Sequence, residues 1–372
     1  MLNRRSFLLQ SLTGGIVLGM NAMTNRLSGK PKREKSPEIW VWMHPKEKWS
    51  SDEWRRAFGD LRKSGVGAVH LLVKNGDRAF YRSAHYKSSS PMLELALAAA
   101  KKEGVAVHAW IFTMLCTNPE IIKTHAEWFA INRNGVSCLE KPPYVGYYKW
   151  LCSTRPEVQE FVSKTIHELA EIDGLAGVHL DYIRLPDVIL PKALQPKYDL
   201  VQDREFPEFD FCYCEVCRKT FQQKFGDDPL KLQDPASSNE WKQFRYDNIS
   251  NIVNQSARIV RADGKAISAA VFATPDLARR YVRQDWTKWD LDKVFPMIYH
   301  NFYAQESGWI EEATREGRRA VGDGKEFFTG LYLPEISTEN LQKAIHFARQ
   351  GGANGVSLFD YETYVKKSYR LK

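Results

Sequence analysis

The chain is 372 residues long, and its 43% hydrophobic and 26% charged residues are typical of a folded globular protein and not of a disordered one. This length is within reach of one large α/β barrel. The formal net charge is +8, but the first thirty residues carry four basic residues and no acid, and no basic run interleaved with aromatics follows them, so the sequence argues against a nucleic-acid partner.

The N-terminus has the pattern of a targeting segment. Residues 3–20, NRRSFLLQSLTGGIVLGM, place a twin arginine before a short apolar run. This pattern resembles the twin-arginine export signal of bacteria, expected here over residues 1–30. The apolar run is short and broken by glycine, which argues against a transmembrane helix, and a cleavage site is not clear. Residues 31–36 are expected to form a polar linker and residues 37–372 the folded domain. We expect an exported protein, periplasmic or extracellular. An uncleaved signal would tether it to the membrane.

The folded domain alternates apolar β-rich runs with amphipathic helical runs, the pattern of parallel βα units. Strands are predicted over residues 38–45, 66–74, 105–115, 175–185, 265–274, 291–300, 326–334 and 355–362. Helices are predicted over residues 49–65, 90–104, 155–173 and 239–263 and around 282–292. Eight strands with helices between them predict the α/β class and a single (β/α)8 TIM barrel, with a Cys-containing insertion after the fourth strand and a last helix that is abbreviated or missing.

Two of these helices carry local signals. In the helix over residues 90–104, Ser90 is the expected N-cap, Pro91 opens the first turn and Gly104 stops the helix. In the segment 282–292, Trp286 and Trp289 have the i, i+3 spacing of a helix face and are interpreted as packing against the barrel.

The stretch GLAGVHLDYIRLPD, residues 174–187, begins as a buried strand and ends in polar side chains. In (β/α)8 barrels the active site lies at the carboxyl ends of the strands. Side chains alternate along a strand, so His179 and Asp181 share one face and Val178 and Leu180 share the other. If the apolar pair covers the helix layer, His179 and Asp181 point into the barrel mouth.

The ends of other predicted strands carry carboxylates, histidines and aromatics: Trp42, His44, Trp110, Tyr299, Glu335 and Asp360. Glycoside hydrolysis needs such an assembly, because one carboxylic acid protonates the leaving oxygen while a second carboxylate acts as base or nucleophile. Aromatic residues make up 12% of the chain and could supply a platform for sugar rings. The sequence therefore favours a hydrolase that acts on a carbohydrate substrate.

Residues 38–362 resemble a family of glycosyl-hydrolase-like barrels labelled family 10-like, distant relatives of the hydrolase domain that acts on bacterial poly-glucosamine exopolysaccharide. The matching stretches are GVHLDYIRLP, then WFAINRNGVS followed by LCSTRPEVQEFV, and VRQDWTKW followed by VFPMIYH. The resemblance implies that Asp181 is the catalytic carboxylate, acting as the acid. It implies that His179, Tyr182 and Arg184 orient this carboxylate or hold substrate, and that Tyr299 lines the cleft.

The second carboxylate is not determined by the sequence. Glu335 is the first candidate, Asp360 the second and Asp276, after the fifth strand, the third. A mechanism in which the acetamido group of the substrate is the nucleophile would need only one carboxylate. Arg184 would lower the pKa of a nearby Asp181, which suits a base or nucleophile better than an acid.

The insertion contains the motif C-x-C-x-x-C at Cys212, Cys214 and Cys217. Three thiols at this spacing could bind a structural zinc ion, but a tetrahedral site needs a fourth ligand and no partner C-x-x-C exists. The remaining cysteines, 116, 138 and 152, lie in the region after the third strand, so disulfides in an exported protein, or free thiols, are the alternative. No cofactor is expected for catalysis.

Two other functions compete with the hydrolase. A non-catalytic carbohydrate-binding barrel would keep the aromatic cleft and lack a carboxylate. A metal-dependent hydrolase is suggested by His44, His70, His108 and His179 on four successive strands. Against it, the first strand carries Trp-Met-His where the amidohydrolase type has His-x-His, and His70 and His108 lie early in their strands, too deep for the mouth.

Overall fold

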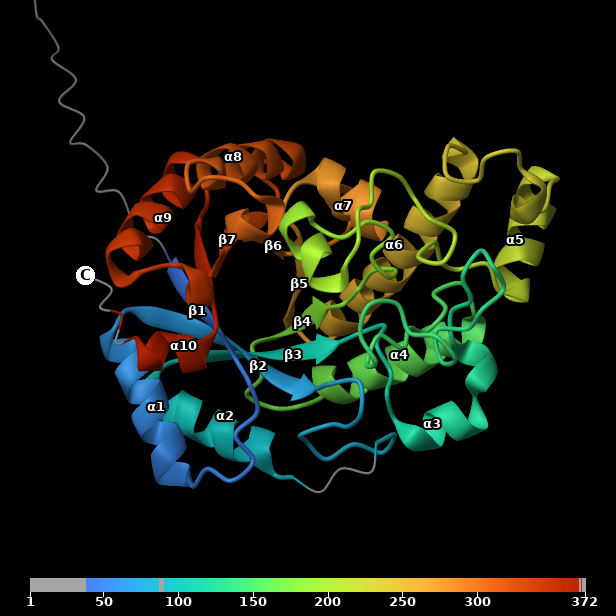
Figure 1. Cartoon of the computed structure of the whole chain (residues 1–372). Helices are drawn as coiled ribbons and strands as arrows, with labels where there is room; N and C mark the ends of the chain where they lie inside the picture. Colours follow the sequence, from blue (N-terminus) through green and yellow to red (C-terminus); the bar gives the residue numbers. More distant parts are fainter. Residues whose placement is uncertain (1–37, 87–89, 368, 370–372) are drawn as a thin grey trace, which may run out of the picture. The chain divides into compact units, whose positions relative to one another are not determined.

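A computed structural model describes residues 38–86, 90–367 and 369, and the predicted export signal lies outside this range. Eight parallel strands form a closed barrel in sequential order, and β1 pairs with β8 (Figure 1). They are β1 (Glu38–Met43), β2 (Val66–Lys74), β3 (Ala106–Phe112), β4 (Gly177–Asp181), β5 (Ala266–Phe272), β6 (Lys293–Met297), β7 (Glu326–Tyr332) and β8 (Gly355–Phe359). The predicted (β/α)8 barrel and all eight predicted strands are confirmed.

Helices follow the strands and surround the barrel (Figure 1). They are α1 (Ser51–Lys63), α2 (Met92–Glu103), α3 (Pro119–Thr124), α4 (Pro156–Ala170), α5 (Glu215–Phe225), α6 (Asn239–Ala262), α7 (Pro275–Val282), α8 (Trp309–Val321), α9 (Thr338–Gln350) and α10 (Tyr361–Lys366). The six-residue α10 confirms that the last helix is abbreviated. Among the described helices, none is long and apolar enough to cross a membrane.

The structure corrects two local predictions. Helix α2 has Pro91 at its N-cap without a side-chain hydrogen bond, so Ser90 does not cap it, whereas Gly104 ends it in the left-handed conformation as expected. Residues 282–292 are not one helix, because α7 ends at Val282 and only a short 3-10 turn, Trp286–Lys288, follows. Trp286 and Trp289 are nevertheless fully buried, as their packing role requires.

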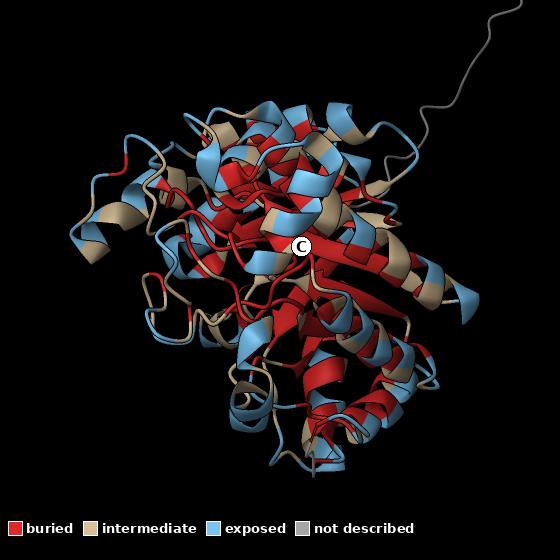
Figure 2. Cartoon of the chain, turned by 90° about the vertical axis from the view of Figure 1, so that its right-hand side faces the viewer, coloured by how far each residue is buried: buried red, intermediate tan, exposed pale blue. Residues whose placement is uncertain are grey.

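The core has two layers, separated by the sheet. Val178 and Leu180 of β4 face the helices and belong to the larger apolar cluster between sheet and helices. Inside the barrel, Trp40, Phe295 and Phe328 pack in a second cluster. Figure 2 shows the buried strands enclosed by helices whose outer faces are exposed. The interior is therefore filled by side chains, and access from solvent is confined to the ends of the strands.

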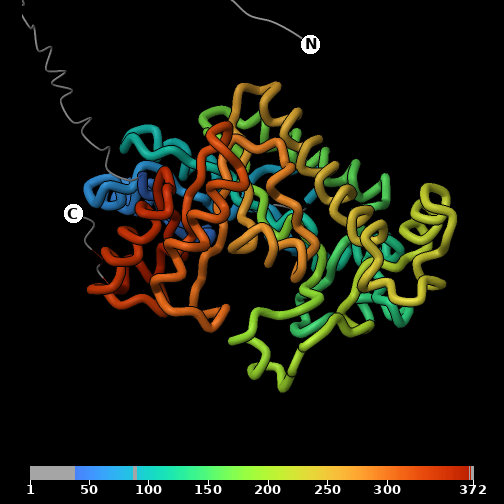
Figure 3. Tube along the Cα trace, turned by 90° about the horizontal axis from the view of Figure 1, so that it is seen from above, coloured from blue at the N-terminus to red at the C-terminus, as the bar shows by residue number. Residues whose placement is uncertain are grey.

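Two long segments build one side of the mouth: residues 113–155, between β3 and α4, and residues 182–238, between β4 and α6. Figures 1 and 3 both show them side by side. An antiparallel bridge joins Asn132 to Phe211, and the amide of Tyr213 donates to the carbonyl of Ile131 at 2.7 Å. These two segments thus form a continuous wall over β3 and β4.

Candidate active site

Asp181 is the last residue of β4 and is held by two hydrogen bonds. The indole Nε1 of Trp110, on β3, donates to its Oδ2 at 2.9 Å, and the amide of Tyr182 donates to its Oδ1 at 2.7 Å. Tyr182 has a φ of 49°, in the left-handed region that non-glycine residues rarely adopt. The chain therefore turns sharply after β4 and fixes the carboxylate at the strand end, the type of local strain that is concentrated at functional sites.

The surroundings of Asp181 favour a proton on its carboxyl group at mildly acidic pH. Burial raises its pKa from 3.8 to about 6, and the two hydrogen bonds and Arg184 offset part of this effect. A carboxylic acid with a pKa near the working pH can both give and take a proton. The lowering by Arg184 that the sequence suggested is present, but burial outweighs it, so the geometry is compatible with the acid role.

The Asp181 side chain opens onto a cavity of about 240 Å³ at the carboxyl ends of the strands. Its walls are mostly aromatic and comprise Trp42, His44, Trp110, Phe112, Asp181, Tyr182, Arg184, Ala270, Met297, Tyr299 and Phe359. Among these lining residues Asp181 is the one carboxylate. A concave, mainly aromatic site with few polar groups is typical of a ligand-binding cleft.

A second cavity of about 130 Å³ adjoins the first, and Arg184, Met297 and Tyr299 line both. The loop segments supply further aromatic rings here, including Tyr144 and Tyr148. We refer to these two adjoining cavities together as the groove.

Arg184 stands between the two cavities and is nearly buried. Its guanidinium pairs with Asp187 at 2.8 Å and lies over the ring of Trp150, 4.8 Å from the ring centroid. The paired carboxylate contributes to holding the pKa of Arg184 above its usual value, although burial acts against it. Asp187 therefore neutralises the positive charge of Arg184 and fixes its guanidinium between the two cavities.

Tyr299 follows β6 and lines both cavities. Burial raises its pKa well above the usual value, and the nearby charges of Asp181 and Asp360 act in the same direction. Its hydroxyl group thus stays protonated and can donate a hydrogen bond across the site.

The three candidates for the second carboxylate differ in position. Asp360 directly follows β8, caps α10 through a hydrogen bond from the amide of Thr363, and has Oδ2 3.7 Å from Nε2 of His44, which lines the cavity. Glu335 lies outside the lining residues of the Asp181 cavity, is exposed, and accepts a hydrogen bond from Asn301. Asp276 is exposed in the first turn of α7. Asp360 is also outside the lining residues, but it directly follows Phe359 and lies next to His44, both of which line the Asp181 cavity.

His179 does not point into the open mouth as expected. It shares the face of Asp181, but it is completely buried one layer below the cavity. Its Nε2 accepts a hydrogen bond from Trp42 Nε1 at 3.1 Å, and its Nδ1 lies 2.9 Å from the hydroxyl of Ser268. Burial lowers its pKa well below the usual value, so the ring is neutral. Its hydrogen bond fixes the indole of Trp42, whose ring lines the cavity.

The structure also shows where the other histidines that suggested a metal-dependent hydrolase lie. His70 stacks on His179 with ring centroids 3.7 Å apart, and both His70 and His108 are buried in the barrel interior. They belong to no metal-ligating group among the described residues. His44, Asp360 and Glu362 are close enough to share a metal ion, but Lys46 pairs with Glu362 at 2.6 Å and supplies a positive charge there.

Several lining residues were not recognised from the sequence. Phe112 lies two positions after Trp110 on β3, so strand alternation was a signal for it. Tyr144 and Tyr148 come from the irregular segment after β3, where no periodic pattern indicates which side chains face the groove.

Comparison with known proteins relates this geometry to other barrels. No protein-family model matches the sequence, and a comparison with curated proteins finds no significant match. Among solved structures, the glycoside hydrolase domain of PgaB (BpsB) from Bordetella bronchiseptica is similar, with a TM-score of 0.70, 14% identity, and coverage of 88% of this chain and 96% of that one. The two chains share the (β/α)8 barrel fold.

Two more structures share this fold. The catalytic domain of β-amylase from Paenibacillus polymyxa has a TM-score of 0.62, 13% identity, and coverage of 90% of this chain and 97% of that one. The β-galactosidase from Marinomonas ef1 has a TM-score of 0.58, 11% identity, and coverage of 87% of this chain and 54% of that one. The (β/α)8 barrel that these structures share therefore spans nearly all of the described chain.

Proposed function

We propose that this protein hydrolyses a glycosidic bond in a polysaccharide or glycan, with Asp181 as the group that protonates the leaving oxygen. The observation that carries the proposal is the position of Asp181: a carboxyl group with a pKa raised to about 6, at the carboxyl end of β4, inside an aromatic cavity. A general acid of this kind accelerates a reaction about 10²–10⁴-fold. The glycoside-hydrolase-like fold of the barrel supports this reaction class.

The groove supports a substrate longer than one sugar. Its two cavities meet at Arg184, Met297 and Tyr299, so a chain of sugars could cross the site beside Asp181. In this arrangement Trp110 positions the acid through its hydrogen bond, and Tyr299 donates a hydrogen bond to substrate. Asp360 supplies the second carboxylate, next to His44 at the cavity edge.

The site of action in this proposal is outside the cytoplasm. The supporting observation is the twin-arginine pattern of residues 1–30, which precedes the described domain. Fusing residues 1–36 to a reporter that is active only after export of the folded protein tests it. Activity that is lost when both arginines are changed to lysine is expected, and activity independent of them would refute it.

A carbohydrate-binding barrel without activity is the second candidate function. It is favoured by the fact that Asp181 is the one carboxylate lining the cavity, whereas most glycoside hydrolases use a pair. Such a protein would bind the same polysaccharides and release no product.

Release of reducing ends from a panel of bacterial and plant polysaccharides distinguishes the two functions. The wild type is compared with Asp181→Asn and with Asp173→Asn, which changes an exposed carboxyl group just before β4, at the other end of the barrel. We expect release by the wild type and the control, and a loss of about 10²–10⁴-fold in Asp181→Asn with unchanged circular dichroism. Binding without release by any of the three proteins would overturn the hydrolase in favour of the binding barrel.

A further inference from the structure

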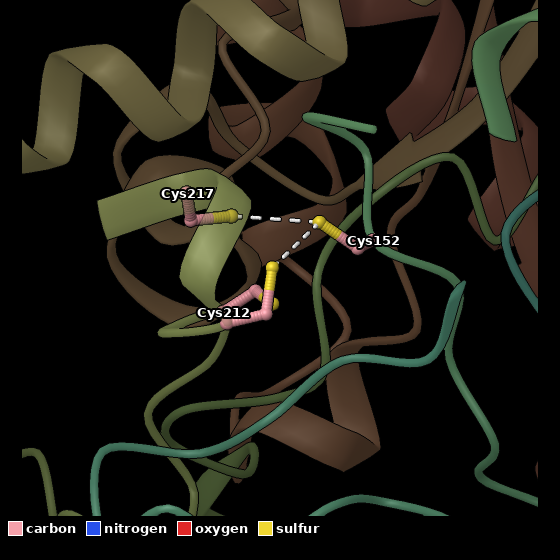
Figure 4. Close-up of side chains that lie close together, drawn as sticks. Cys152, Cys212 and Cys217 are labelled. Atoms are coloured by element: carbon pink, nitrogen blue, oxygen red, sulfur yellow. Dashed lines mark hydrogen bonds between the residues drawn. The ribbon is translucent and has the colours of Figure 1, made fainter. Parts of the chain in front are cut away.

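Four buried cysteines from two distant parts of the sequence meet in the wall that residues 113–155 and 182–238 form over β3 and β4. Cys212, Cys214 and Cys217 belong to the insertion after β4, and Cys152 comes from the segment between β3 and α4. The four sulfur atoms all lie within 4.8 Å of one another. Figure 4 shows the sulfur of Cys152 directed at that of Cys217 on α5. The fourth thiol that the sequence motif lacked is thus supplied by tertiary structure.

The distances favour a common ligand over a cross-link. The sulfur of Cys152 is 3.5 Å from that of Cys214 and 3.4 Å from that of Cys217, so neither is its preferred partner. A tetrahedral zinc ion with Zn–S bonds of about 2.3 Å separates its sulfur ligands by about 3.8 Å, close to this spacing. A disulfide would require sulfurs about 2.05 Å apart, much closer than either of these pairs.

We infer that Cys152, Cys212, Cys214 and Cys217 bind one zinc ion as a closed, structural four-thiolate site. Four sulfur ligands in tetrahedral arrangement are the donor set of structural zinc sites. Polar groups around the cluster suit thiolate ligands: the amide of Ile131 donates to the Cys212 sulfur at 3.5 Å, and the hydroxyl oxygen of Thr154 is 3.1 Å from the Cys217 sulfur. Such outer contacts orient ligands and stabilise their negative charge.

The position of the site indicates what the ion does. It joins the two segments that form the wall over β3 and β4, and three of its ligands lie at or next to the N-terminus of α5. Trp150, two residues before Cys152, packs against the guanidinium of Arg184 and the ring of Tyr182, both of which line the groove. Zinc therefore holds the groove wall in place without contacting substrate, and its presence does not depend on whether the groove is catalytic.

The experiment measures metal in the full-length chain, purified without chelators. Elemental analysis should find about one zinc per chain. Cys212→Ser should reduce this to near zero, whereas Cys116→Ser and Cys138→Ser, which change buried cysteines outside the cluster, should retain it. Replacing zinc with cobalt(II) in the wild type should give the intense visible absorption of tetrahedral thiolate coordination. Alkylation after unfolding in chelator without reductant should modify all six cysteines.

Other outcomes overturn the assignment. A wild type without bound metal, or one that holds stoichiometric iron, contradicts the zinc site. Alkylation of only four cysteines shows a disulfide in the chain, and zinc that persists in Cys212→Ser lies elsewhere. If the serine variant does not fold, the cobalt spectrum and the thiol count of the wild type still decide, because both are measured without any substitution in the cluster.

Discussion

Replacing Asp181 with asparagine should change stability in a pH-dependent way. Burial raises the pKa of this carboxyl group from 3.8 to about 6 in the folded protein. Because the folded pKa is the higher one, the unfolded chain releases the proton first as pH rises. Ionisation of Asp181 therefore does not lower the free energy of unfolding below about pH 4. Above this value it lowers the free energy of unfolding increasingly, until the pH exceeds about 6.

The magnitude follows from the size of the shift. Roughly two pKa units at 1.36 kcal/mol each give a cost of about 3 kcal/mol at most, and solvent in the cavity lowers this figure. The substitution also removes one acceptor from the pair of hydrogen bonds made by Trp110 and Tyr182, which costs about 1–3 kcal/mol at every pH. We therefore compare the stability difference between variant and wild type at two pH values. The constant term cancels in this comparison, and the free-energy cost of burying the charged carboxylate remains.

Urea unfolding followed by circular dichroism at about pH 4 and about pH 8 measures this difference. The stability of Asp181→Asn relative to wild type should rise by about 1–3 kcal/mol between the two conditions. Asp173→Asn, with an exposed side chain, should stay within about 0.5 kcal/mol of the wild type at both. A relative stability of Asp181→Asn that does not change with pH would show that the carboxyl group is not destabilised by burial, and would refute this reasoning.

Further predictions concern activity. If Asp181 is the acid, hydrolysis falls as pH rises through about 6, because the protonated form is the active one; a rate that rises through this range in a pH profile would contradict the assignment. Trp110→Phe removes a hydrogen bond that lowers this pKa, so the same profile should move to higher pH by about one unit, and a move to lower pH would be inconsistent with the observed bond. Asp360→Asn should reduce kcat about 10²-fold or more and more severely than Glu335→Gln, since Asp360 contacts the lining residue His44 whereas Glu335 pairs with Asn301; the reverse order would restore Glu335 as the second carboxylate.

Periodicity predicted most of the fold because the signals are local. Strand alternation places Asp181 on the inner face and Val178 and Leu180 toward the helices, and the structure confirms both. Alternation does not give the height of a residue along the barrel axis, which depends on the tilt and stagger of all strands. For this reason the face of His179 was predicted correctly but its depth was not, and it lies beneath Trp42 instead of in the mouth.

The remaining parts of the site depend on contacts between distant segments. Cys152 is sixty residues before Cys212, and no spacing rule connects the two across α4 and β4. The candidate carboxylates show the same limit. Asp360 comes directly after β8 and caps the next helix, whereas a 3-10 turn after β7 carries Glu335 to the surface. The sequence identifies both as strand-end acids, but the path of the loop decides which one contacts a residue that lines the cavity.

Dependence on the leaving group tests most directly whether Asp181 is the proton donor of a glycoside hydrolase. A polysaccharide leaving group needs a proton, whereas an activated aryl group such as nitrophenolate leaves without one. Using the sugar identified from the polysaccharide panel, Asp181→Asn should lose about 10²–10⁴-fold in activity on the polysaccharide and retain most of its activity on the aryl glycoside. Equal losses on both substrates would contradict the acid role, and no loss on either would show that Asp181 does not take part in the reaction.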